Sequence, residues 1–355
     1  MPDPAFPKKG AFMNSSSHFL KEADFDSFVE GLLKTAPVYA PVAKKNWFVF
    51  APIASPKEVR LDYDLTILPP KKVIFPVRQE LVAFGPAGAS SSIKPEPRIL
   101  LGVHFYDIKA IDMLDLLFRE NNVDWNYLAQ REATTIVGSS IQKVAKRAFW
   151  ATVGKGVKPR GHDAFLTRLP GGYLLEVLTP KGEKLLACGK FQAASKAQIE
   201  EAEKINKDIL EKCPEKLSHG SHEIAAKVRA NFKSKLWDEL SRTCFSCGTC
   251  NIVCPTCYCF DVQDNWNLDQ VSGQRARAWD GCLLEDFAKV SLGAGACENF
   301  REQRGQRYRH RLMRKAAYLN EKLGGPACVG CGRCSTQCVP DIADPVRIIE
   351  TIMES

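Results

Sequence analysis

The distribution of cysteine constrains this chain more than any other feature of its sequence. Its 355 residues include 14 cysteines, of which none precedes Cys188 and the last twelve lie between Cys244 and Cys338. Residues 1–9 contain no apolar signal segment, and no apolar run approaches the roughly 20 residues that cross a bilayer, so we expect a cytoplasmic location. Because stable disulfides are rare in that compartment, the cysteines indicate metal or redox chemistry.

Two stretches share one spacing of cysteines, C-x2-C-x2-C-x3-C. The first runs from Cys244 to Cys254 and is followed by Pro255, and the second runs from Cys328 to Cys338. In this spacing three thiolates bind one cubane iron–sulfur cluster and the fourth binds its neighbour. We therefore predict two [4Fe-4S] clusters. The ligands are Cys244, Cys247, Cys250 and Cys338 for cluster one, and Cys328, Cys331, Cys334 and Cys254 for cluster two.

Two other kinds of metal site use similar spacings. Zinc binds paired C-x2-C units, but it would leave the third and fourth cysteines of both motifs unexplained. Such a site would use Cys244, Cys247, Cys328 and Cys331. The spacing of Cys250, Cys254 and Cys257 is that of a radical S-adenosylmethionine cluster, yet two of these cysteines already belong to the repeated motif and no long βα repeat follows.

Four cysteines remain between the motifs: Cys257, Cys259, Cys282 and Cys297. The first three could hold a third iron–sulfur centre, or they could be structural thiols that pack against cluster two. Cys188 and Cys213 are isolated in the sequence, and Cys213 lies on an apolar helical stripe that predicts a core position.

Composition and motif separation predict an α+β protein with more than one domain. A chain with 45% hydrophobic and 25% charged residues is an ordinary globular protein. We expect an N-terminal mixed α/β domain for partner docking at residues 1–190, a helical connector at 191–243, and an α-helical ferredoxin-type domain at 244–355. A small bacterial-type ferredoxin has no room for the residues between the motifs, so we expect helices in the insert, residues 260–327.

Hydrophobic periodicity predicts the elements of the N-terminal domain. Residues 99–103 and 134–137 are predicted to be buried strands, with a helix between them. Residues 165–177 are predicted to form an antiparallel meander around a Pro-Gly-Gly turn, and the small residues at 85–92 a surface loop.

The connector and the C-terminus carry helical patterns. Apolar stripes predict one helix over residues 199–213 and another over 224–240. Asp344 and Pro345 have the residue types preferred at the N-cap and first position of a helix, and therefore predict a last helix that begins there.

Basic residues are concentrated in one segment of the insert. Residues 301–315 contain seven arginines and lysines and a single acid, Glu302. Arg304, Arg307, Arg311 and Arg314 fall on one helical face. Such a face could tune a nearby anionic cluster, dock an acidic partner or bind nucleic acid, although interleaved aromatic residues are almost absent. A solvated face neutralised by nearby glutamates is the plainest alternative.

Signals for other chemistry are missing. The sequence has no G-x-G-x-x-G motif after a strand, no Walker A motif, and no convincing catalytic triad or carboxylate pair. His104, near a strand end, is more typical of a structural histidine than of a general base. Electron transfer is therefore the default function, and no catalytic residue is assigned.

The stretch from about Tyr39 to Pro340 resembles the iron–sulfur β subunit of cytosolic sulfhydrogenases, which are [NiFe]-hydrogenases, and the A subunit of anaerobic sulfite reductase. The segments that carry the resemblance are 68–72, Gly102 to His104 with Asp107, Arg131-Glu132, 254–264, Trp279-Asp280 with Cys282, 299–301, and 328–334. Segments 254–264 and 328–334 are the most specific.

The resemblance implies an electron relay within a hetero-oligomeric complex. FAD and NAD(P) would bind a partner flavin subunit, and a second partner would carry the catalytic metal, of the [NiFe]-hydrogenase or the sulfite-reductase kind. One departure affects the relay path, because relatives often carry cysteines where this chain has Tyr106, Ile141, Ala148 and Trp150. If those cysteines bind a further cluster, this chain has lost it.

We therefore predict a non-catalytic electron-transfer subunit. One alternative is a reductase whose own substrate-binding metal centre uses Cys257, Cys259 and Cys282. The other is an iron–sulfur protein that binds nucleic acid through its arginine face, which would make binding strongly salt-dependent.

Overall fold

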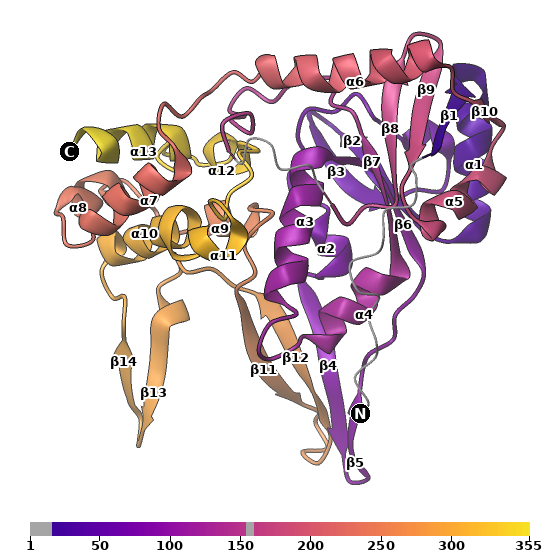
Figure 1. The fold of residues 1–355 in the computed structure, drawn as a ribbon. Helices are drawn as coiled ribbons and strands as arrows, with labels where there is room; N and C mark the ends of the chain where they lie inside the picture. Colours follow the sequence, from indigo (N-terminus) through magenta and orange to yellow (C-terminus); the bar gives the residue numbers. More distant parts are fainter. Residues whose placement is uncertain (1–15, 154–159) are drawn as a thin grey trace.

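The computed structural model describes residues 16–153 and 160–355, so residues 1–9, in which we expect no signal segment, lie outside the described residues. A sheet-and-helix half and a helical, cysteine-rich half lie side by side, and two groups of strands project from the same end of the molecule (Figure 1). The mixture of helices and strands confirms the α+β class. Within the described ranges, none of the helices has the length and apolarity that a membrane crossing requires.

The N-terminal half is built on an eight-stranded mixed sheet. Its strands follow the order β10-β1-β9-β8-β7-β6-β2-β3, and the pairs β2–β6, β6–β7 and β7–β8 are parallel. The bounds are β1 Ser16–Lys21, β2 Val38–Lys44, β3 Trp47–Pro52, β6 Arg98–His104, β7 Thr134–Ser139, β8 Ala164–Leu169, β9 Gly172–Val177 and β10 Phe191–Ala193. The strands predicted at 99–103 and 134–137 and the meander at 165–177 are confirmed.

Helices cover both faces of this sheet because neighbouring residues of its central strands point to opposite sides. Ile99 and Leu101 of β6 pack with the first helix, whereas Leu100 packs with the third and fourth. The helices of this half are α1 Phe25–Thr35, α2 Lys71–Ile74, α3 Phe105–Leu117, α4 Trp125–Ala133, α5 Pro180–Lys184 and α6 Lys196–Glu211, with 3-10 turns η1 Glu22–Asp24, η2 Pro56–Glu58 and η3 Leu185–Cys188.

Helix α3 lies between the two halves (Figure 1). Ile108, Ile111 and Leu114 face the sheet core, and Tyr106 and Ala110 pack on the other side against Val329 and Cys331 of the second cysteine motif. A helix that is buried on both sides in this way fixes the second motif against the N-terminal half.

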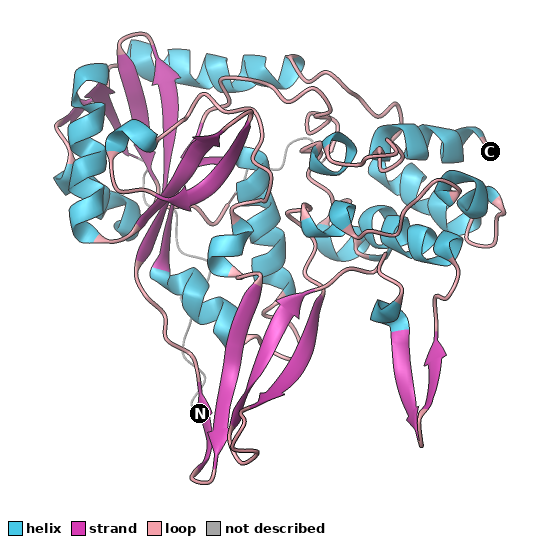
Figure 2. Cartoon of the chain, turned by 180° about the vertical axis from the view of Figure 1, so that it is seen from behind, coloured by secondary structure: helices cyan, strands magenta, loops and turns pink. Residues whose placement is uncertain are grey.

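A second sheet joins the insert to the N-terminal half. Its order is β11-β12-β4-β5, with bounds β4 Arg78–Gly85, β5 Gly88–Ser91, β11 Phe260–Trp266 and β12 Gly273–Trp279. A separate hairpin follows, made of β13 Lys289–Gly293 and β14 Ala296–Asn299, after the 3-10 turn η4 Asp286–Ala288. Seen from behind, both groups of strands extend away from the helices (Figure 2).

These strands correct two expectations. The first part of the insert, residues 260–299, forms strands rather than helices. Here β12 pairs with β11 and with the edge of β4, whereas β13 and β14 pair, within the described residues, only with each other. The expected loop at 85–92 is exposed, as predicted, but most of it belongs to the β4–β5 hairpin.

The cysteine-rich half is helical outside these strands. Its elements are α7 Ser221–Ala230, α8 Leu236–Ser241, α9 Thr249–Ile252, α10 Arg304–Met313, the π-helical turn η5 Arg314–Tyr318, α11 Asn320–Leu323, α12 Arg333–Thr336 and α13 Pro345–Glu354. The helix predicted over 224–240 is two helices, because the chain leaves the helix at Asn231 and re-enters it at Leu236. The predicted cap of α13 is confirmed, since the Asp344 carboxylate accepts from the Val346 and Arg347 amides.

Candidate metal centre

The two cysteine motifs fold into loops of the same conformation. Ser246 and Gly330, each two residues after the first cysteine of its motif, have φ of 54° and 64°. Gly248 and Gly332, each directly after the second cysteine, have φ of 72° and 78° and cap the short helices α9 and α12. In each loop a backbone N–H donates toward the first cysteine sulfur, Ser246 to Cys244 at 3.4 Å and Gly330 to Cys328 at 3.5 Å. The two motifs therefore share their backbone conformation as well as their cysteine spacing.

The electrostatic neighbours of the thiols form two sets that meet at Cys334, which is a neighbour of both Cys250 and Cys328. Burial raises the pKa of Cys250 to about 12, and Cys334, Cys244 and Cys338 add to that shift. Burial also raises the pKa of Tyr308, whose neighbouring thiols are Cys250, Cys244 and Cys338. The fourth cysteine of the second motif therefore lies with the first motif.

The second set has the reciprocal membership. Burial raises the pKa of Cys328 to about 11, and Cys254 and Cys334 raise it further. The pKa of Cys331 is raised by burial, with Cys254 and Cys334 again among its neighbours. Cys254, the last cysteine of the first motif, thus lies among the first three of the second. Cys247 is exposed, and its thiol donates to Thr249 Oγ1 at 3.3 Å.

Buried cations surround the second set. Arg333, between Cys331 and Cys334 in the chain, is fully buried and donates to both Asp107 carboxylate oxygens at 2.6 and 2.7 Å. Lys71 of α2 donates to the Cys257 carbonyl and lies 4.3 Å from the Trp279 ring centroid, and burial lowers its pKa to about 8. An anionic centre at these thiols would repay the cost of burying this lysine.

Lys315, in the π-helical turn of the cysteine-rich half, contacts the same loop. Its Nζ donates to Thr256 Oγ1 at 2.6 Å, and that oxygen lies 3.3 Å from the Cys254 sulfur. Burial lowers the pKa of Lys315, but the thiols of Cys254, Cys257 and Cys328 outweigh burial and hold the pKa above its ordinary value. Lys71 belongs to segment 68–72, which carried the family resemblance. Nothing in the residues around Lys71 predicted that its side chain and that of Lys315 would contact the same loop.

The basic segment is largely internal. Arg307 and Arg311 of α10 are each 4% exposed, Arg304 is exposed, and Arg314 starts the π-helical turn with its guanidinium 5.2 Å from the Tyr258 ring centroid. Burial lowers the pKa of Arg311, but Cys250 and Cys334 lead a group of thiols from both sets that raises it well above normal. The alternative of a continuous solvated face is wrong, and a nucleic acid cannot reach the two buried arginines. Tuning and docking remain predictions.

The remaining cysteines lie at three kinds of position. Asn251 Nδ2 contacts Cys282 Sγ at 3.4 Å and Cys257 Sγ at 3.8 Å. Burial raises the pKa of Cys259 to about 11, and the neighbouring Cys282 thiol adds to this shift. Cys213 is a core residue, as predicted, and Cys188 packs at the edge of the α1 core. Cys297 is exposed on β14. Over residues 16–153 and 160–355, no three His, Cys, Asp or Glu side chains form a site for a single metal ion.

The four N-terminal positions at which the family resemblance led us to look for cysteines gather at one place. Tyr106, Ile141, Ala148 and Trp150 belong to one apolar core together with Cys331. His104, just before this group, is fully buried, stacks on Tyr63 at 3.9 Å between centroids and contacts the Tyr106 hydroxyl at 2.8 Å. These contacts agree with a structural role for His104, and aromatic and aliphatic side chains fill the space beside the second motif.

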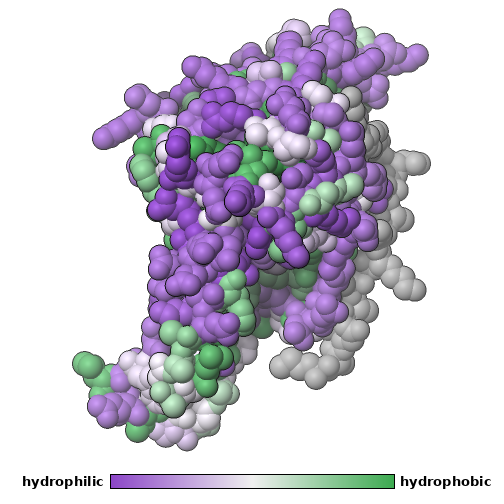
Figure 3. Space-filling model, turned by 90° about the vertical axis from the view of Figure 1, so that its left-hand side faces the viewer, coloured by the Kyte–Doolittle hydropathy of each residue, from purple (hydrophilic) through white to green (hydrophobic). Residues whose placement is uncertain are grey.

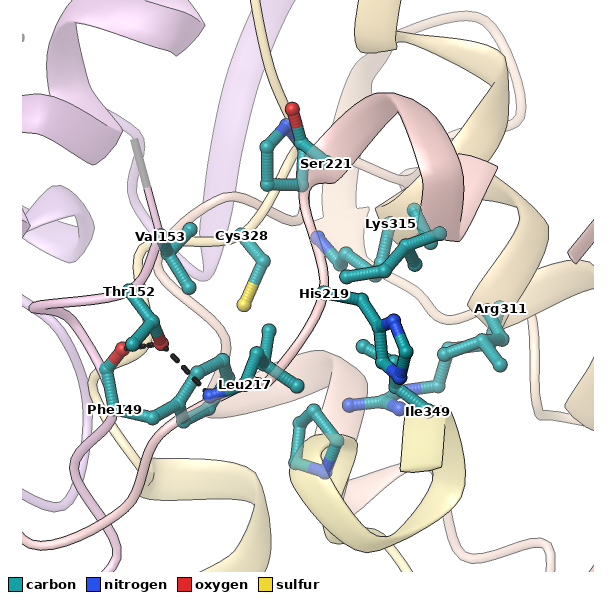
Figure 4. Close-up of a pocket in the computed structure, with 15 residues that line it drawn as sticks. Phe149, Thr152, Val153, Leu217, His219, Ser221, Arg311, Lys315, Cys328 and Ile349 are labelled. Carbon is teal, nitrogen blue, oxygen red and sulfur yellow. Dashed lines mark hydrogen bonds between the residues drawn. The ribbon is translucent and has the colours of Figure 1, made fainter. Parts of the chain in front are cut away.

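A cavity borders the second set of thiols. Cys328 directs its sulfur into it, and Arg311, Lys315 and His219 line it from the cysteine-rich half (Figure 4). Phe149 and Val153 line it from the N-terminal half. Cys328 is the one cysteine among the described residues of its mostly apolar lining, so the cavity places Arg311 and Lys315 beside a single thiol of the second set.

Comparison with known proteins identifies the family. A family model described as a 4Fe-4S dicluster domain matches residues 243–342. The chain is 32% identical over 332 residues to sulfhydrogenase 2 subunit beta of Pyrococcus furiosus, which covers 93% of this chain and 96% of that protein. No solved structure matches the chain. The chain is thus an iron–sulfur protein that belongs to the sulfhydrogenase β-subunit family.

Proposed function

We propose that the chain is the electron relay of a cytoplasmic oxidoreductase complex and carries two [4Fe-4S] clusters. Cys244, Cys247, Cys250 and Cys338 hold cluster one, and Cys254, Cys328, Cys331 and Cys334 hold cluster two. Each cluster supplies one-electron transfer when bound. The donor is a flavin subunit that binds NAD(P), the acceptor is a subunit with a catalytic metal, and the N-terminal α/β domain docks partners.

The observation that carries this proposal is that the fourth cysteine of each motif has neighbours in the other motif. Cys338 of the second motif neighbours Cys250, and Cys254 of the first motif neighbours Cys328. Ligands exchanged in this way hold two clusters close together, which favours electron transfer between them. Arg311, which neighbours Cys250, Cys334 and Cys254, would favour added negative charge on both clusters.

The first test is composition. The chain is purified without oxygen, and iron, acid-labile sulfide and zinc are measured together with the EPR spectrum after dithionite reduction. About eight irons and eight sulfides with coupled reduced-cubane signals support the relay. Zinc without sulfide would overturn it.

A second test separates exchanged from unexchanged ligation. A triple variant, Cys328→Ser with Cys331→Ser and Cys334→Ser, keeps cluster one alone. Adding Cys338→Ser should then change the EPR spectrum and the iron content, whereas adding Cys254→Ser should not. The reverse result would show that each motif holds its own cluster.

The contacts of Asn251 with Cys257 and Cys282 favour one second candidate, a reductase with its own metal centre at Cys257, Cys259 and Cys282. This candidate predicts about twelve irons in the intact chain. It also predicts that Cys259→Ser lowers that number to about eight, and that the isolated chain turns over substrate with artificial electron donors. The relay alone predicts no turnover and no loss of iron in this variant.

A further inference from the structure

The two sets of thiols differ in their access to solvent. In the first set, Cys247 is exposed and Cys338 is partly exposed. In the second set Cys254 and Cys331 are buried and Cys328 and Cys334 are partly exposed, so that among these eight thiols only Cys247 is exposed. Helix α3, Arg333 and Lys315 pack around the second set. An electron that enters or leaves the protein surface therefore has its shortest route through the first set.

Exposed apolar side chains stand next to the first set of ligands. Phe245, between Cys244 and Cys247, is 66% exposed, and Val339, directly after Cys338, is 85% exposed. Trp47 is 46% exposed and lines a shallow groove together with Cys338 and Val339. Large apolar side chains exposed together are typical of a protein–protein contact.

Cations flank these apolar residues. Lys44 and Lys45 precede Trp47 at the β2–β3 turn and are exposed. Arg242 and Arg304 are exposed beside the first motif, and the Arg304 guanidinium donates to the Arg242 carbonyl at 3.0 Å.

Acidic residues near these cations are fewer or already paired. Asp341, the acid nearest to Val339 in the sequence, is paired with Arg147 and Arg347. Asp238, Glu239 and Glu302 are exposed near Arg242 and Arg304. The four exposed cations exceed these three acids by one charge, and Lys44 and Lys45 beside Trp47 supply the positive excess.

We propose that this surface, the cluster-one face, docks an acidic protein that carries its own redox centre near its surface. The face is defined by Trp47, Phe245 and Val339 with Lys44, Lys45, Arg242 and Arg304. The inference rests on the proposed relay. A cluster with four thiolate ligands is anionic and would repel an acidic partner, so the surrounding cations are needed to bring such a partner into contact. The apolar centre then excludes water between the two redox centres.

The projecting strands provide an internal comparison. Trp266, Leu268 and Val271 are exposed at the far end of β11 and β12, and the projecting part of the molecule carries hydrophobic surface (Figure 3). A strand rises about 3.3 Å per residue, so the seven residues from Phe260 to Trp266 carry this end roughly 20 Å along the strand from the cysteines. Contacts there can hold a partner but cannot deliver electrons directly to the first set.

The test uses the iron-loaded full chain and an acidic plant-type [2Fe-2S] ferredoxin as the probe. Calorimetry measures the Kd at low and high salt, and stopped-flow absorbance measures electron exchange after reduction of the chain by a viologen. One double variant reverses charge, Lys45→Glu with Arg242→Glu, and another removes apolar area, Phe245→Ser with Val339→Ser. The matched controls are Lys289→Glu on β13 and Leu268→Ser between β11 and β12.

Both double variants should weaken binding and slow exchange by about tenfold or more at low salt, and the charge reversal should also flatten the salt dependence. The controls should change either quantity less than about twofold, and viologen should reduce every protein at the same rate. Double variants that behave like the controls would overturn the docking inference, as would a preference for a basic redox protein. A chain that viologen cannot reduce at all would instead overturn the relay itself.

Discussion

Replacing Asp107 by alanine should destabilise the protein strongly, because it leaves the Arg333 guanidinium buried without its counter-ion. Both side chains of this pair are 0% exposed, and the guanidinium also donates to Thr66 O at 2.9 Å and Thr66 Oγ1 at 3.0 Å. Removal of one partner from a buried pair costs about 3–5 kcal/mol. With a urea m-value of about 3 kcal/mol/M, the unfolding midpoint should fall by at least about 1 M.

The assay is anaerobic urea unfolding of the iron-loaded chain, followed by circular dichroism and by iron–sulfur absorbance. The control is Asp62→Ala, which breaks an ion pair whose side chains are 44% and 54% exposed and should cost less than about 1 kcal/mol. The double replacement Asp107→Leu with Arg333→Leu should recover much of the loss, because it removes both charges. If Asp107→Ala shifts the midpoint no more than Asp62→Ala does, the reasoning about the buried pair is refuted.

Three further predictions concern loops, pH and a helix end. Gly330→Ala should lower the iron content because the added Cβ would lie 2.5 Å from the Trp150 nitrogen, whereas Gly324→Ala, at a similar φ of 65° with open space around it, should cost only about 1 kcal/mol and keep its iron. Burial, and to a lesser extent the charge of Arg131, lowers the pKa of His162 to about 4 in the folded protein. In the unfolded chain the histidine already binds a proton near pH 6.5, so the free energy of unfolding decreases as the pH falls from 6.5 to 4. Midpoints of His162→Phe measured across that range should fall less steeply than those of the wild type, and equal slopes would contradict the assignment. Asp344→Ala should cost about 1 kcal/mol by removing the cap of α13, which a lower Tm would reveal and an unchanged Tm would exclude.

The cysteine motifs could be predicted from sequence because their geometry is local. Four thiols within eleven residues fix a loop, and the same spacing at Cys328 reproduces the φ values found after Cys244. The strands at 99–103, 134–137 and 165–177 were equally predictable, since apolar runs such as 99–103 have no other stable location.

Contacts between distant segments could not be read in this way. Lys71 and Lys315 converge on the loop after Cys254 from residues far apart in the chain, and neither has a distinctive local pattern. The strands of the insert were missed for a related reason. The alternation of Phe260, Val262 and Trp266 in β11 is interrupted by Asp264. Its partner β12 pairs in turn with β4, which precedes it by almost two hundred residues.

The pairing of β12 with β4 makes the iron-binding region difficult to detach. Arg277 of β12 is 2% exposed, forms an ion pair with Asp124, donates to Gln79 Oε1 at 2.6 and 3.0 Å and stacks 4.7 Å from the Phe75 ring centroid. If the chain were cut at residue 243, Arg277 would lie on one fragment and its partners on the other. The unpaired edge of β4 would then be open to aggregation. Evolution could therefore exchange the dicluster region between proteins only together with a compatible β4 edge.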